Sequence, residues 1–307
     1  PFDPVIRDGW MSGRGAGDMK AGVASAVFAL DALRRIGLQP AATVYMQSVV
    51  EEESTGNGAL MTHLRGYKAD AALVPEPGNE GLTRANLGVL WFQLEVRGIP
   101  VHVANMGTGA NAIDAAYRVI GALRQLEERW NAKAKAHDLF GAHHHPINLN
   151  LGKIEGGDWA SSVPAWCRID CRIAFLPGTS AAAAAAEIEA CITEFARRDS
   201  FLANNPPRVI WNGFFAEGYR LEPGSGAERT LAAAHLAVTG QPLEDRLVTA
   251  YLDARVYALY DKIPVLNYGC IAENYHGFDE RVDLASVLRT TQVIAQFVAD
   301  WCGVEPA

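Results

Sequence analysis

The sequence has no run of lysine or arginine and no long apolar segment. Its 27 basic and 35 acidic residues leave a formal charge of −8, so a surface that follows nucleic-acid phosphates is not expected. No apolar run reaches the ~18 residues that cross a bilayer, and no basic-then-apolar leader opens the chain. We therefore expect a soluble protein that binds neither nucleic acid nor membrane.

Cysteine is also scarce. The chain has 5 Cys, an odd number that fits reduced thiols better than a disulfide framework. Cys167 and Cys171 lie four positions apart in an alternating pattern, so we expect both on one face of a strand, packed in a core. This usage of cysteine favours the cytoplasm.

The first part of the chain has the pattern of a parallel α/β unit. Residues 21–36 predict a buried helix that Gly37 ends. The short apolar runs 43–50 and 71–74 predict strands that are covered on both faces. The opening segment PFDPVIRDGW resembles a loop inside a domain, so we expect residues upstream of Pro1.

The pattern changes near Gly88, where residues 88–97 alternate as in a half-exposed antiparallel strand. A β-α-β-β-α-β order follows, typical of a ferredoxin-like unit, with elements at 88–97, 112–130, 147–154, 165–175, 181–198 and 208–214. We expect an α/β domain with a mostly parallel central sheet at 1–89 and 213–307. An α+β domain would be inserted at 90–212, with the strand 88–97 at its edge.

Acidic residues follow the predicted turns and strands of the α/β domain. Asp18 ends the glycine-rich segment GRGAGD at the mouth of the first helix, where it could bind a ligand or only cap the helix. A dinucleotide loop is disfavoured, because Asp18 stands where GxGxxG needs its third glycine. Glu51, Glu52 and Glu53 follow the strand 43–50 and could instead form an exposed acidic loop.

Two further groups extend this set. Glu76 lies between two prolines after the strand 71–74, which suits either a ligand or a rigid turn. His276, in ENYHGFDERV, follows another short apolar run and could serve as a neutral imidazole ligand. Carboxylates and a histidine at the ends of successive strands suggest a dinuclear metal site that a carboxylate bridges.

The segments GRGAGDMKAG, EEE, PEP and YHGFDERV resemble the zinc-dependent superfamily of aminoacylases, acetylornithine deacetylases, succinyl-diaminopimelate desuccinylases and carboxypeptidase G. The resemblance covers essentially the whole chain and implies hydrolysis of a small N-acyl amino acid or a related amide. It implies two zinc ions per subunit, with cobalt possible. By resemblance, Asp18 bridges the ions, Glu53 and His276 bind one ion, Glu76 binds the other, and Glu52 is the general base.

The resemblance also assigns residues in the inserted domain, which it makes a lid that pairs two subunits into a homodimer. His102 resembles a histidine that stabilises the oxyanion in the partner's site, and Arg172 resembles an arginine that holds the substrate carboxylate. Asn111 and Ser161 are further substrate-binding candidates. Ser161 stands where the family usually has asparagine, so this contact could pass to a neighbouring residue.

One family motif does not occur. The family carries a second metal-binding histidine in His-x-Asp, and this sequence contains no such triplet, so we expect the second metal site to be incomplete in this chain. Two alternatives stay open: a dipeptidase or exopeptidase of the same superfamily, and a catalytically impaired member. A serine hydrolase is disfavoured because no G-x-S-x-G segment is present.

Overall fold

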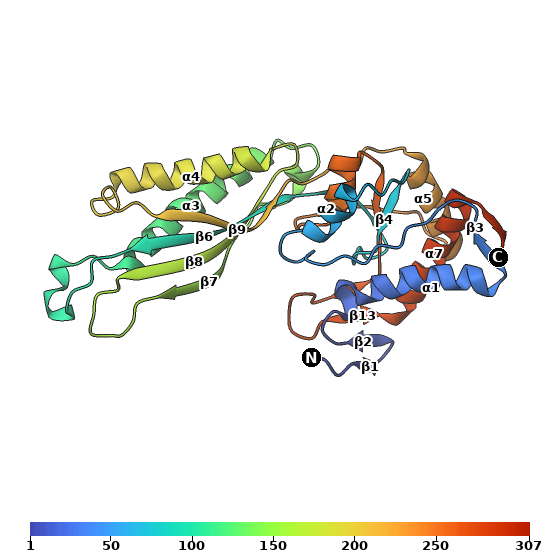
Figure 1. Ribbon diagram of the computed structural model, residues 1–307, viewed down its shortest axis with the longest axis horizontal. Helices are drawn as coiled ribbons and strands as arrows, with labels where there is room; N and C mark the ends of the chain where they lie inside the picture. Colours follow the sequence, from blue (N-terminus) through green and yellow to red (C-terminus); the bar gives the residue numbers. More distant parts are fainter.

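The computed structural model describes residues 1–307, which form two lobes joined by two extended segments (Figure 1). We call the lobe built from residues 88–216 the sheet lobe and the rest, which contains both ends of the chain, the terminal lobe. Every helix is too short or too polar to span a bilayer.

The sheet lobe has the predicted β-α-β-β-α-β order. Its strands form one antiparallel sheet in the order β7-β8-β6-β9, with two helices covering one face (Figure 1). The elements are β6 (Gly88–Arg97), α3 (Ala112–Ala134), β7 (Leu149–Gly156), β8 (Trp166–Phe175), α4 (Ala181–Arg198) and β9 (Arg208–Ala216). This is the arrangement of a ferredoxin-like unit.

The expectation that the strand 88–97 lies at an edge is wrong. β6 is central, paired with β8 along its whole length and with β9 on its other side. The polar residues that suggested solvent exposure have protein partners instead. Gln93 donates a hydrogen bond to Asp170, and Arg168 pairs with Glu95 at 2.8 Å. Polar side chains that are paired within the sheet therefore give the same apolar–polar alternation as a strand with one face in solvent.

One hydrophobic core fills the space between this sheet and its helices, with 27 buried residues. Small residues of α4, including Ala181, Ala184 and Ala185, are buried there and permit close packing. Cys167 and Cys171 are buried in the same core, as predicted, and no cysteine of the chain forms a disulfide.

The terminal lobe is built from helices of 3 to 19 residues and from short strands. Its helices are α1 (Ala21–Arg35), α2 (Asn57–Leu64), α5 (Gly226–Thr239), α6 (Ala254–Val256) and α7 (Leu284–Cys302). Two strand pairs are parallel: β4 (Ala72–Val74) with β11 (Val265–Asn267), and β5 (Leu82–Asn86) with β10 (Asp245–Val248). A second core of 17 buried residues lies among these elements, and the predicted α/β class is confirmed.

The remaining strands of this lobe are antiparallel. β1 (Val5–Arg7), β2 (Trp10–Ser12), β13 (Arg281–Asp283) and β12 (Ala272–Glu273) form one sheet, and β3 (Leu38–Pro40) pairs with β14 (Val304–Pro306). The β2–β13 pairing brings the segment before Asp18 beside the segment after His276, far apart in the sequence.

The predicted strand at residues 43–50 is not formed. No neighbouring strand pairs with this segment, and Val44, Tyr45 and Met46 are exposed. An apolar β-branched run favours an extended backbone, but a strand also needs a partner for its N–H and C=O groups. The segment instead lies along one wall of a cavity of about 1010 Å³.

Candidate metal centre

The glycine-rich segment is held from behind by one buried carboxylate. The N–H groups of Gly15, Gly17 and Asp18 donate to Glu280 at 2.8, 3.0 and 3.0 Å. Burial alone would raise the pKa of Glu280, but these N–H groups and the Arg14 charge lower it below its usual value. Glu280 thus stays ionised and fixes where the Asp18 backbone lies.

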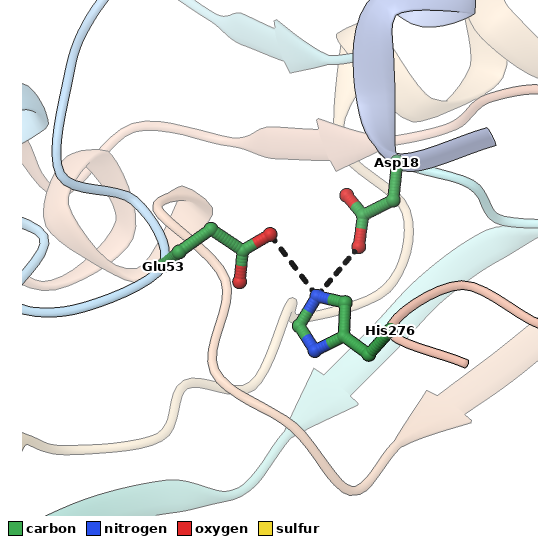
Figure 2. Close-up of side chains that lie close together, drawn as sticks. All are labelled: Asp18, Glu53 and His276. Carbon is green, nitrogen blue, oxygen red and sulfur yellow. Dashed lines mark hydrogen bonds and ion pairs between the residues drawn. The ribbon is translucent and has the colours of Figure 1, made fainter. Parts of the chain in front are cut away.

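Asp18 does not cap the helix that follows it, since no side-chain cap is formed at either η1 (Ala16–Lys20) or α1. Its carboxylate instead faces His276 and Glu53 (Figure 2). His276 Nε2 lies 3.1 Å from Asp18 Oδ2 and 3.0 Å from Glu53 Oε1. One ligand atom from each of the three residues lies within 4.8 Å of the others, as in a group that can hold a metal ion.

The acidic triplet forms a tight turn rather than a simple extension of a strand. The Glu51 carbonyl accepts the N–H groups of Ser54, Thr55 and Gly56, and Glu51 has φ of 65°. The carboxylates of the turn differ in exposure. Glu51 and Glu53 are exposed, whereas Glu52 is partly buried.

Glu76 is the most buried acid of the group, with 5% of its surface exposed. Glycines allow neighbouring backbone to close on its turn: a Cβ at Gly22 would lie 1.9 Å from the Pro75 carbonyl oxygen. Burial raises the pKa of Glu76 well above its usual range, and the charges of Glu52 and Asp18 raise it further.

Glu52 has a similar environment. Burial raises the pKa of Glu52 to about 8, with additional repulsion from Asp253, Glu53 and Asp18. Glu52 and Glu76 line the largely apolar cavity, and Asp18, Glu53 and His276 are not among its lining residues. The centre therefore combines a ligand set for a cation with Glu52, a carboxyl group whose pKa is raised to about 8.

Three candidates from the sheet lobe lie elsewhere. His102, Asn111 and Ser161 are close to the ends of β6 and β8 that point away from the terminal lobe (Figure 1). His102 Nδ1 accepts the Ala104 N–H, and Asn111 caps α3 by accepting from Ile113 and Asp114. The Ser161 carbonyl accepts the Val103 N–H. The chain does not bring these residues to its own acidic centre.

Arg172 lies at the other end of the same sheet, where the two lobes meet. It donates to the Thr249 carbonyl at 3.1 Å, and burial lowers its pKa. No carboxylate of the protein pairs with it, and burial is the one cause of its pKa shift. Its free donors suit an anionic substrate group.

Sequence reasoning missed two residues beside the acidic turn, Tyr251 and Asp253. Both are buried, and burial raises the pKa of Asp253 to about 6. They stand about 200 positions after the triplet, so only tertiary contacts reveal the relation. The run TAYLDARV contains a single acidic residue, so its sequence gives no signal that it lies beside an acidic centre.

Comparison with known proteins identifies the family. Residues 1–300 match the description Peptidase family M20/M25/M40, and the chain belongs to this family. It is therefore a hydrolase of amide bonds, as the sequence predicted, and metal-dependent in keeping with its family and its candidate metal site.

Individual relatives agree with this assignment. An N-formyl-4-amino-5-aminomethyl-2-methylpyrimidine deformylase of Bacillus subtilis is 29% identical over 98% of this chain and 74% of its own length. A protein of the same name from Halalkalibacterium halodurans is 26% identical, over 100% of this chain and 75% of its own. The solved dipeptidase Dug1p from Saccharomyces cerevisiae has a TM-score of 0.76 at 16% identity, covering 100% of this chain and 76% of its own, which shows a shared fold.

Proposed function

We propose that this protein hydrolyses the amide bond of a small N-acyl compound, and that Asp18, Glu53, Glu76 and His276 hold zinc for this reaction. The convergence of Asp18, Glu53 and His276 within 4.8 Å carries the proposal. Several carboxylates grouped at one centre repel one another, and divalent cations would offset this repulsion. Carboxylate oxygen and imidazole nitrogen are donors that zinc accepts, and cobalt fits the same set.

The residues suggest how the reaction would proceed. A bound zinc supplies Lewis-acid chemistry that favours attack on a carbonyl. Glu52 takes a proton from the attacking water and returns it to the nitrogen of the leaving amine. With bound cations nearby, the Glu52 pKa falls from about 8 and the base becomes ionised near neutral pH. Arg172 orients a negatively charged part of the substrate.

The acyl group is proposed to be small, with formyl as the leading candidate and acetyl or succinyl next. Support comes from the two relatives named as deformylases of a formylated aminopyrimidine. The dipeptidase alternative has support from the fold alone. The acyl and amine preferences are therefore tested together.

The direct test removes metal with a chelator and then restores zinc or cobalt. Turnover of N-formyl, N-acetyl and N-succinyl amides and of dipeptides is followed before and after. We expect activity to disappear and return, with a formyl or acetyl amide preferred over dipeptides. Full activity after complete metal removal would overturn the metal-dependent mechanism, and preference for dipeptides would favour the alternative.

We also propose that residues 90–212 act as a lid and that the protein is a homodimer. The separate core of the sheet lobe supports the division into domains. His102, Asn111 and Ser161 lie at the far end of the sheet, and in a homodimer a second copy could bring its acidic centre to them. His102 would then stabilise the oxyanion and Asn111 and Ser161 would contact substrate.

Mixing two inactive variants tests this arrangement. If His102 serves the partner's site, Glu52→Gln and His102→Ala subunits combined in one dimer recreate one complete site. We expect each variant alone to be weak and the mixture to recover up to about a quarter of wild-type activity. No recovery from a demonstrated mixed dimer would contradict the proposal.

A cytoplasmic location is proposed from the five free thiols, three of which are buried. Unpaired cysteines persist in reducing compartments. Fractionation of cells that express the protein with its native ends tests this point, and recovery from an extracellular fraction would contradict it.

A further inference from the structure

A buried pair of side chains lies directly behind the acidic turn of residues 51–56. The Tyr251 hydroxyl donates to Asp253 Oδ1 at 2.8 Å, and both residues are at most 8% exposed. The Tyr251 ring packs on Phe214 with centroids 4.2 Å apart, so the ring has little freedom. The hydroxyl is therefore presented from a fixed position.

This hydroxyl touches the turn at Gly56. A Cβ added to Gly56 would lie 1.8 Å from the Tyr251 oxygen and 3.3 Å from Asp253 Oδ1. Gly56 in turn donates its N–H to the Glu51 carbonyl at 2.9 Å and closes the turn. The pair thus contacts the turn at the residue where its backbone hydrogen bonds converge.

Asp253 also lies near Glu52 in the same turn. The charge of Asp253 raises the pKa of Glu52, and its side chain lines the cavity that Glu52 also lines. Asp253 Oδ2 is buried and has no hydrogen-bond partner. A buried carboxylate with an unused oxygen is costly, which favours a role beyond packing.

We propose that Tyr251 and Asp253 are positioning residues that hold the acidic turn so that Glu52 faces the reacting amide. The inference rests on the proposed function of Glu52 as the base. A shift of about 1 Å in a catalytic group can lower turnover about 10²-fold, so a clamp behind the turn affects turnover more than substrate binding.

The variant Tyr251→Phe removes the hydroxyl and keeps the ring. We expect kcat to fall about tenfold with KM within about twofold, because a hydrogen bond that aligns the turn is lost. Amide hydrogen exchange at residues 54–56 should become about tenfold faster, a readout that needs neither metal nor substrate. Tyr268→Phe is the matched control, since its buried hydroxyl bonds His235 at 2.9 Å outside the acidic turn.

A second pair of variants separates the hydrogen bond from general stability. Asp253→Asn keeps an acceptor for Tyr251, so we expect it to retain about tenfold more kcat than Asp253→Ala. Wild-type kcat and exchange in Tyr251→Phe, an equal effect of Tyr268→Phe, or equal losses in the two Asp253 variants would each overturn the inference. An active Glu52→Gln variant would overturn the proposed function instead, which keeps the two failures distinct.

Discussion

The acids of the acidic centre have surroundings opposite to those of the buried acids in the sheet lobe. In the sheet lobe, Glu95 pairs with Arg168, and Glu127 pairs with Arg124 at 2.9 Å and accepts the Leu149 N–H at 2.7 Å. In the terminal lobe, Glu52 and Glu76 face other acids. The sheet lobe pairs its buried acids with cations, whereas the acidic centre leaves negative charge that a bound cation can offset.

This difference separates structural from functional acids. A buried carboxylate with a cation and N–H donors holds the fold together, and its removal leaves those partners unsatisfied. A buried carboxylate among other acids destabilises the metal-free protein and is retained for chemistry. Substitutions of these two kinds of acid should therefore act on different properties.

The largest effect is expected from Glu52→Gln. Loss of the general base should lower kcat about 10³-fold in the metal-loaded protein, while KM and metal content change little. Glu51→Gln is the control, because Glu51 is exposed in the same turn and accepts the Thr55 hydroxyl there. Steady-state kinetics with a formyl amide measure both. A Glu52→Gln variant with near wild-type kcat would remove Glu52 from the chemistry.

A slightly smaller effect is expected from His276→Ala on metal affinity. The substitution removes one of three converging ligand atoms, so the dissociation constant for zinc should rise by more than about 100-fold. Calorimetric titration of the metal-free protein measures it. His144→Ala changes an exposed histidine outside this group and should leave affinity unchanged. Equal affinities of the two variants would argue against the metal triad.

The pH dependence of stability should differ between the lobes. In the metal-free protein the folded-state pKa of Glu52, about 8, lies above its ordinary value of 4.5, so unfolding releases a proton between these values. Stability is complete below about pH 4.5 and is lost as pH rises toward 8, by on the order of 3 kcal/mol. Urea unfolding from pH 5 to 8.5 should show this fall, with a smaller slope for Glu52→Gln. Identical slopes for the wild type and Glu52→Gln would contradict the raised pKa of Glu52.

The smallest effect concerns Glu127 in the sheet lobe. Glu127→Ala leaves Arg124 and the Leu149 N–H without their partner, so it should lower the free energy of unfolding by about 2 kcal/mol. Glu128→Ala, at the exposed neighbouring position, should change it little. Metal affinity should stay at the wild-type value in both, since the lobe holds no part of the acidic centre. A loss of metal affinity in Glu127→Ala would contradict the assignment of Glu127 to a purely structural role.

The sequence alone determined the α/β class, the order of elements in the sheet lobe and the candidate ligands. Periodicity is local information, which is why α4 (Ala181–Arg198) and β6 were placed at the correct residues. Pairing is not local, so the central position of β6 and the unpaired segment 43–50 were predicted incorrectly. The motif resemblance predicts Asp18, Glu53 and His276 as ligands of one metal site.

Only the tertiary structure decided which of these side chains meet. Asp18 and His276 are brought together because β2 pairs with β13, a contact between residues about 270 positions apart. The same folding places His102 at the far end of the sheet and sets Tyr251 and Asp253 behind the acidic turn. The physical reason is that long-range packing and strand pairing are set by the whole chain, whereas motifs report only the chemistry that a segment can supply.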